Sequence, residues 1–282
     1  MSVLLNTCKI SVENPHSRIT FETKGGGSWK VWDRYLFLDG RPACHIGNVC
    51  DTCSFFFEKQ EGATGKVSPS RVSDLLRAGL RNLEVDFVQS AGSTVLPTGH
   101  YRVSLLRLTP EFVRPGEMSD YFSHEQLELW EVDQVVGGPH DPKCEYYRGE
   151  SRFLGKNLSA SYRPFNNGGQ SSQLFEFIIP ITNPDLLDHE RVEFYRDRFV
   201  AGAESTALSI SVLDIKGPAT WEGDPAVNEH WCLAHYLLDG HHKIHAASLA
   251  RKPITLLSFL DVSKGVAYEK DEQLLFENLL LT

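Results

Sequence analysis

The chain of 282 residues has few cysteines, no long apolar run and no excess of positive charge. Its six cysteines are too few for a disulfide-built scaffold. No apolar stretch approaches the roughly 18 residues that a membrane helix requires. Residues 1–7 lack the basic start and apolar stretch of a secretory leader. We therefore expect a cytoplasmic protein with reduced thiols and no membrane association.

The charge balance argues against one class of partner. The chain carries 28 Lys and Arg against 37 Asp and Glu, a net charge of -9. General nucleic-acid binders present a basic face that neutralises phosphates, so we do not expect that function. A local basic pocket for a small-molecule or nucleotide substrate remains compatible with this charge, and so does a homo-oligomer.

The first half of the chain is predicted to be rich in strands. Segments with many aromatic and β-branched residues indicate strands at 19–22, 29–38, 54–58, 83–88 and 101–108. Ser68-Pro69 begins one helix among them, and Ser123, with Gln126 in the capping-box position, begins another that ends near residue 131. Glycine, proline and asparagine dominate residues 137–169, which we expect to form long loops.

Strands and helices alternate in the second half of the chain. Strands are expected at 174–181, 207–215, 233–238 and 254–260. Helices are expected from Asn183-Pro184 to about residue 200, over 241–250 and over 271–280. We therefore predict an α+β fold, with a β-rich N-terminal domain (1–170) packed on a mixed-sheet C-terminal domain (171–282).

The turn Asp239-Gly240-His241-His242-Lys243 lies between a predicted strand and a predicted helix. A helix start leaves backbone N–H groups unpaired and carries partial positive charge, so it stabilises an anion. Gly240 permits a positive φ and close approach. The two histidines and Lys243 add donors and positive charge. Asp239 can cap the helix, hold a metal ion that accompanies a phosphate, or act as a general base.

The same segment resembles the ParB/sulfiredoxin superfamily. The run Tyr236 to Ala247, followed by Lys252-Pro253-Ile254, has that family's pattern of apolar strand, Asp/Gly turn, basic or histidine pair, Ala-rich helix and Pro-led strand. The resemblance covers residues 207–266. It implies a ParB/sulfiredoxin-like C-terminal part whose turn binds nucleotide phosphates. It is poorly specific for reaction, because the superfamily includes kinases, nucleotide hydrolases, reductases and DNA-partition switches.

The resemblance also assigns roles to single residues. Gly240 corresponds to the family's turn glycine, His242 to its phosphate-contacting histidine, and Lys243 to a usual arginine. Since lysine is a point charge, the planar two-pronged contact of arginine is lost. His241 stands where sulfiredoxins have their catalytic cysteine, which argues against that redox reaction. Asp214 is the candidate for the family's acidic residue after an early strand.

A second constellation is formed by cysteines. Cys50 and Cys53 have the Cys-x2-Cys spacing of a zinc knuckle, and Cys44 lies six residues upstream. Zn²⁺ in structural sites takes four ligands. Candidates for the fourth are His45, Cys144, His100 and Cys232. The alternatives are three thiols without metal, or a redox pair of Cys50 and Cys53.

Other polar groups are weaker candidates. A metal site could be drawn from His235, His241, His245 and Asp239 or Glu229. Cys232 and His235 would point to opposite faces of a strand, however, which argues against one shared site. Polar and aromatic side chains also gather in loops, at Asp120, His124, Glu125 and Tyr146-Tyr147-Arg148.

Four functions are compatible with these patterns. The first is a phosphotransferase or phosphohydrolase that uses ATP or another nucleotide with Mg²⁺. Gly240, His242 and Lys243 would bind phosphate in it, with Asp239, His241 and Asp214 as candidate catalytic residues. The others are a nucleotide or metabolite sensor without turnover, a metal-dependent hydrolase using the histidine-rich turn, and a zinc-stabilised structural protein.

Overall fold

The structure is a computed structural model that describes residues 2–23, 34–47, 55–63, 67, 70–117, 119–122, 144–155, 158, 171–216 and 229–280. A nine-stranded mixed sheet forms its centre, in the order β1-β6-β13-β11-β12-β10-β8-β7, with β9 also paired to β10. Its strands are β1 (Val3–Val12), β6 (Gly99–Leu108), β7 (Glu111–Val113), β8 (Tyr146–Arg148), β9 (Arg152–Gly155), β10 (Ser172–Pro180), β11 (Thr206–Lys216), β12 (Glu229–Asp239) and β13 (Ile254–Leu260). The pairs β10/β12 and β11/β13 are parallel, and the other neighbours in this sheet are antiparallel.

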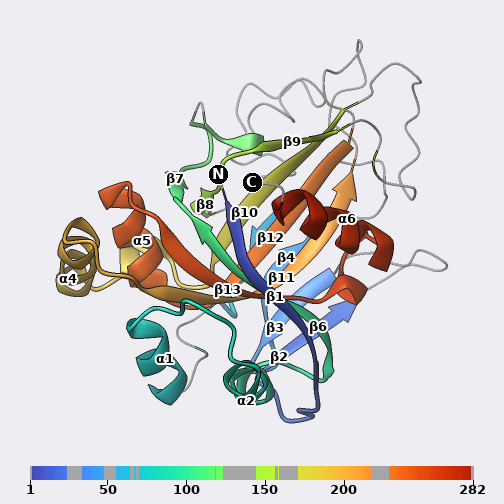
Figure 1. The fold of residues 1–282 in the computed structure, drawn as a ribbon, viewed down its shortest axis with the longest axis horizontal. Helices are drawn as coiled ribbons and strands as arrows, with labels where there is room; N and C mark the ends of the chain where they lie inside the picture. The colour runs from blue at the N-terminus through green and yellow to red at the C-terminus, as the bar shows by residue number, and fades with distance from the viewer. Residues whose placement is uncertain are drawn as a thin grey trace.

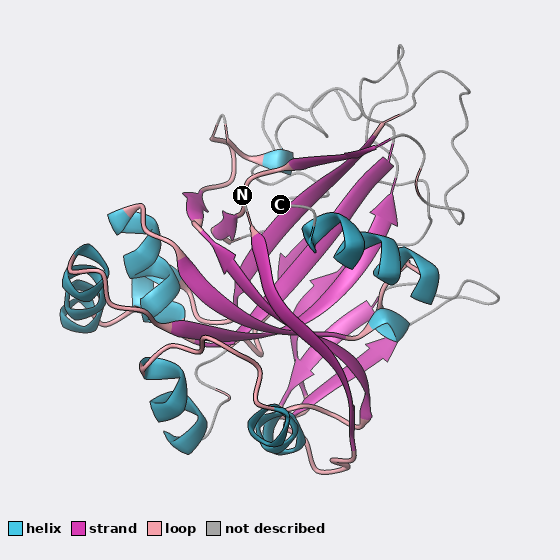
Figure 2. Cartoon of the chain, in the orientation of Figure 1, coloured by secondary structure: helices cyan, strands magenta, loops and turns pink. Residues whose placement is uncertain are grey.

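Smaller elements surround this sheet (Figure 1). A four-stranded antiparallel sheet contains β2 (Ile19–Thr23), β3 (Arg34–Leu38), β4 (Arg41–Ile46) and β5 (Phe57–Lys59). The helices are α1 (Ser70–Arg77), α2 (Val85–Val95), α4 (His189–Val200), α5 (His241–Ala250) and α6 (Glu269–Leu280), with short 3-10 turns η1 (Pro184–Leu186) and η2 (Val262–Lys264). Figure 2 shows these helices arranged around the strands. Within the described parts of the chain, no helix is long and apolar enough to cross a membrane.

The large sheet is covered on both faces. Along β12, Cys232, Ala234, Tyr236 and Leu238 belong to one apolar cluster, together with the small sheet, α1 and α2. Trp231, Leu233 and Leu237 belong to the other cluster, with α4, α5 and α6. Successive strand residues point to opposite faces, so this double cover explains why β11, β12 and β13 are buried along their whole length.

The structure confirms the predicted α+β class and most of the C-terminal pattern. The strands expected at 207–215, 233–238 and 254–260 and the helices at 241–250 and 271–280 are present as β11, β12, β13, α5 and α6. The large sheet contains strands from before and after residue 170. β6 pairs with β13, and β1 pairs with the other edge of β6. The predicted turn site depends on the order strand, turn, helix, strand, and the structure has this order in β12, Gly240, α5 and β13.

Two predictions were wrong. Residues 83–88 were expected to form a strand, but α2 begins at Val85, because Val88, Ala91, Gly92 and Val95 recur at helical spacing and are buried. The helix expected from Asn183 is divided into η1 and α4. Leu187 is extended between them, and the Asp188 side chain accepts hydrogen bonds from the amides of Glu190 and Arg191, which starts a new helix.

Two other predictions concern residues 123–169. The helix expected at 123–131 lies outside the described residues. The loop region expected at 137–169 contains two short strands, β8 and β9, and only residues 144–155 and 158 of it are described.

Candidate functional site

The turn between β12 and α5 has the geometry of a helix start. Gly240 has φ 95° and ψ 20°, in the left-handed region, and the amide of Ile244 donates to its carbonyl at 2.9 Å. A Cβ at position 240 would lie 2.8 Å from the Cβ of Ala207 on β11. Glycine is therefore required here both by backbone conformation and by close packing.

The first amides of α5 have no acceptor in the part of the chain that the structure describes. Among the described residues, none accepts a hydrogen bond from the backbone N–H of His241 or His242. The N-terminus of a helix carries partial positive charge, and its unpaired N–H groups favour an anion.

A cavity of about 210 Å³ adjoins these amides. Its lining comprises the five turn residues and side chains from α1, the β10–α4 connection and α4, namely Ser73, Arg77, Thr182, Leu186, Leu187, Arg191 and Tyr195. Arg77 and Arg191 were not identified from the sequence, because they lie far from the turn along the chain and have no motif around them. They add two arginines to the residues that line a cavity beside a helix N-terminus.

The Lys243 side chain is hydrogen-bonded to the large sheet. It is buried, and its Nζ donates to the carbonyl of Thr206 on β11 at 2.9 Å. Its positive charge still lies beside the cavity that it lines. The side chain therefore contributes charge to this region while it fixes α5 to β11.

The two histidines of the turn act as acceptors. Nε2 of His241 accepts from the amide of Thr182 at 3.2 Å, and Nε2 of His242 accepts from the amide of Asp188 at 3.1 Å. Burial lowers the pKa of His241 to about 4, and burial together with Arg191 lowers the pKa of His242. Both rings are therefore neutral at neutral pH, and they hold the β10–α4 connection against the turn.

Asp239 orders the turn through both carboxylate oxygens. Oδ1 accepts from the amide of Gly240 at 2.7 Å, and Oδ2 accepts from the hydroxyl of Ser73 at 2.5 Å. The side chain makes no capping bond to α5 itself. Both contacts are structural, because one orders the turn and the other ties it to Ser73 on α1.

Asp214 does not lie at this turn. On the β11/β12 pair, Asp239 is opposite Leu208 whereas Asp214 is opposite Cys232. Asp214 is six positions along the strand from Leu208, a distance of roughly 20 Å. Asp214 instead forms a fully buried ion pair with Arg34, at 2.9 and 2.5 Å, and accepts from the amide of Val266. Burial alone would raise the pKa of Asp214, but Arg34 and Lys216 hold it below the ordinary value.

The cysteine constellation is described only in part. Cys44 is a free, fully buried thiol in the core, and burial, with Cys144 nearby, raises its pKa far above the ordinary value. Cys50 and Cys53 lie outside the described residues. His45 follows Cys44 on β4, so the two side chains point to opposite faces, and the His45 ring stacks on Tyr35. Across the described ranges, no group of three or more His, Cys, Asp and Glu side chains is placed to hold a metal ion.

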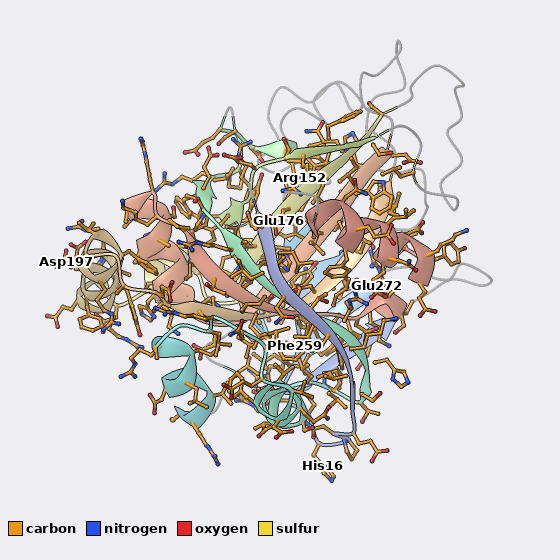
Figure 3. The ribbon with its side chains drawn as sticks, in the orientation of Figure 1. His16, Arg152, Glu176, Asp197, Phe259 and Glu272 are labelled. Atoms are coloured by element: carbon orange, nitrogen blue, oxygen red, sulfur yellow. The ribbon has the colours of Figure 1, made fainter. Side chains whose placement is uncertain are left out.

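A buried polar network lies on the opposite face of β12 from Cys232. Nδ1 of His235 is 2.7 Å from Oγ of Ser211 and 3.2 Å from Oγ of Ser258, and Nε2 is 3.2 Å from Oε1 of Glu176. Figure 3 labels Glu176 in the interior, where it also accepts from Ser2. The order Ser-His-Glu is that of a nucleophilic triad. Ser211 and His235 are 0% exposed, however, so a substrate has no access to this serine, and the network serves to satisfy buried polar groups.

The remaining polar candidates also have structural partners. Asp120 is buried and accepts from the hydroxyl of Tyr146 at 2.8 Å, and His245 pairs with the hydroxyl of Tyr147 at 2.9 Å. His124 and Glu125 lie outside the described residues. The cavity at the start of α5 thus remains the best-supported candidate site.

No family model, curated protein or solved structure matches this chain.

Proposed function

We propose that the cavity at the start of α5 binds the phosphate group of a nucleotide or another small phosphorylated molecule. The observation that carries this proposal is a convergence. His241 and His242, whose amides have no acceptor among the described residues, line the same cavity as Arg77 and Arg191. Amide N–H groups at a helix start together with arginine are the donors that phosphate oxygens prefer.

The charges in the cavity favour an anion. Among the described residues, Arg191 makes no ion pair, and Arg77 forms one with the exposed Asp74, at 3.0 Å. Asp239 is the single carboxylate among the described lining residues, and the hydroxyl of Ser73 and the amide of Gly240 already satisfy its oxygens. The unused polar groups of the cavity are thus chiefly donors.

The size of the cavity limits the ligand. A volume of about 210 Å³ is below the 300–1,000 Å³ of pockets that enclose a drug-sized molecule. It accommodates a phosphate group and a few further atoms. The base of a nucleotide such as ATP would therefore extend beyond the described lining.

Binding without turnover and phosphoryl transfer make different demands on Asp239. In phosphoryl transfer, Asp239 would be the group within the cavity that holds Mg²⁺ or accepts a proton, because Asp214 is remote. A sensor requires only the donors. Two hydrogen bonds already occupy the oxygens of Asp239, which favours a sensor as the second candidate function. The resemblance to the ParB/sulfiredoxin superfamily supports a nucleotide phosphate as the ligand of both the enzyme and the sensor.

The test compares arginine variants by isothermal titration with inorganic phosphate, ATP, ADP and CTP, each with and without Mg²⁺. Arg191→Ala and Arg77→Ala are expected to weaken binding by about 1–3 kcal/mol each, the value of one charge-assisted hydrogen bond. Arg196→Ala is the matched control, because Arg196 lies on α4, pairs with Glu193 and does not line the cavity. Lys243 and His242 are less suitable positions, since their bonds to Thr206 and Asp188 also support the fold.

Equal affinity in the two arginine variants and the wild type would exclude this site. Release of phosphate or transfer of a phosphoryl group from ATP, abolished by Asp239→Asn, would identify an enzyme. Retained binding with no turnover would identify a sensor.

A further inference from the structure

A second, larger cavity lies near the opposite end of β13. Its volume is about 660 Å³, within the range of sites that enclose small organic ligands. It is formed by β1, the start of β6, the residues that follow β13, and the first turn of α6. Its polar lining includes Lys9, His100, Arg102, Asp261, Glu269 and Glu272.

One carboxylate oxygen of Glu272 accepts no hydrogen bond from the described residues. Its side chain is 7% exposed, and its Oε1 accepts no hydrogen bond from any part of the chain that the structure describes. The nearest cationic atom is Nε of Arg102, at 3.7 Å. That nitrogen donates instead to the hydroxyl of Thr7 at 2.8 Å, and the guanidinium lies over the Phe276 ring. Buried carboxylate oxygens without a donor are rare in folded proteins, so this one has room for a donor that the described residues do not supply.

Figure 3 labels Glu272 between α6 and the strands of the sheet. Burial raises the pKa of Glu272, against the opposing effect of Lys9 and Arg102. The ionised carboxylate is thus costly in the empty cavity and would be stabilised by a cation placed beside it.

Asp261 is a second acceptor in the same cavity. It is buried, and its Oδ1 takes both donors of Ser263, the amide at 3.0 Å and the hydroxyl at 2.6 Å. Within the described residues, nothing donates to its Oδ2. This oxygen would lie 3.4 Å from a Cβ at position 99, so Gly99 leaves the approach to it open. Burial raises the pKa of Asp261 as well.

The fixed cations of the cavity donate no hydrogen bond to Oε1 of Glu272, although Nε of Arg102 forms an ion pair with it at 3.7 Å. Nζ of Lys9 is 3.2 Å from Glu269 at the surface, and Nε of Arg102 is used by Thr7. The lining contains three carboxylates, two fixed cations and His100, and it also includes Tyr268, which is 50% exposed. Nζ of Lys270 lies 5.8 Å from the centre of the Tyr268 ring, so a cation of the protein already lies over one of its faces.

We propose that this cavity binds a small organic cation, a primary amine or diamine, whose ammonium group donates hydrogen bonds to Glu272 and Asp261. An anion does not fit, because the unsatisfied groups are acceptors. A bare divalent cation is disfavoured, because such ions take about six oxygen ligands and this lining brings basic side chains close to its carboxylates. The apolar and aromatic part of the lining suits the carbon chain of an amine.

The experiment titrates the full chain with 1,4-diaminobutane in a calorimeter. Binding of the diamine is expected, with no heat from 1,4-butanediol, succinate or MgCl₂ under the same conditions. Equal binding of the diol would show that charge is not recognised, and binding of succinate or Mg²⁺ in place of the diamine would overturn the ligand class. Absence of diamine binding would overturn the site itself.

Variants locate the binding. Glu272→Gln and Asp261→Asn are each expected to raise the Kd for the diamine by about tenfold, the effect of one charge-assisted hydrogen bond. Glu277→Gln, an exposed position on the same helix outside the lining, is expected to leave the Kd unchanged. The thermal midpoint of each variant is measured in parallel. An unchanged Kd in folded Glu272→Gln would refute the assignment.

Discussion

The histidines of the α5 turn show how burial changes what a residue type contributes. His241 was expected from the sequence to belong to a cationic cluster, but its ring is buried and accepts a backbone hydrogen bond. The neutral imidazole of His241 accepts a hydrogen bond from an amide in the folded state, and it takes up a proton when the chain unfolds in acid. The contribution of His241 to the stability of the folded state therefore depends on pH.

We predict that His241 makes the folded state sensitive to mild acid. Its pKa of about 4 lies below the unfolded value of 6.5, so the folded state binds fewer protons in this interval. The stabilisation is present above pH 6.5 and is lost as the pH falls towards 4. Between pH 7.5 and 5, the wild type should lose about 2 kcal/mol more unfolding free energy in urea titrations than His241→Gln.

The comparison between variants isolates this effect. Asp261 and Glu272 have raised pKa values, so they favour the folded state as the pH falls and act in the opposite direction. They are unchanged in His241→Gln and cancel in the difference. His16→Gln, at an exposed position, should show the wild-type pH dependence. The same loss in wild type and His241→Gln would show that His241 is not responsible.

Single residues also show where sequence reasoning succeeds. The turn at Gly240 was predictable because glycine, its neighbours and the flanking apolar runs are contiguous. Arg77 and Arg191 were not, because only the packing of α1 and α4 around the turn brings them to the cavity. Glu272 was placed in an amphipathic helix, but its missing donor is a property of the folded environment alone.

At the scale of elements, the β12–α5 junction depends on a glycine for two separable reasons. We predict that Gly240→Ala destabilises the protein more than Gly202→Ala does. Gly202, which follows α4, also has a positive φ of 82°, but nothing lies within 4 Å of an added Cβ there. Its substitution should cost about 1–2 kcal/mol, the strain of a left-handed alanine. At Gly240, the 2.8 Å contact with Ala207 should add at least about 1 kcal/mol.

Urea denaturation of both variants measures the difference. Equal losses would mean that the backbone near Ala207 shifts without cost, and the close packing assigned to this turn would then be wrong. Phosphate titration of Gly240→Ala shows in addition whether the cavity tolerates the change.

Some elements were misassigned for identifiable reasons. Val85 and Val88 are β-branched residues, which favour strands. The packing of Gly92 against Ile10 and Val12 nevertheless stabilises α2 as a helix. The strand β1 was not predicted, because its central residues are only partly buried and give no regular apolar alternation. The pairing of β1 with β6, nearly a hundred residues later, sets its conformation.

At the scale of the molecule, the large sheet connects both halves of the chain. The parallel neighbour β11 lies on one side of β13, and β6, from the first half, lies on the other. We predict that residues 171–282 alone do not fold, because β13 would lose the strand that satisfies its outer edge and the cover of its second face. Circular dichroism of this fragment should show no cooperative thermal transition. A cooperative transition would instead support an independent C-terminal domain.

The register shift at Leu5 affects how two copies of the sheet can meet edge to edge. The β1/β6 register shifts between Leu4 and Asn6, so Leu5 has no opposite residue, and β1 ends the order of the described strands. A regular outer ladder would offer an approaching copy a continuous template. Here the extra residue breaks the spacing of the outward N–H and C=O groups near the start of the strand, so edge-to-edge growth of the sheet into fibrous assemblies is obstructed from this side.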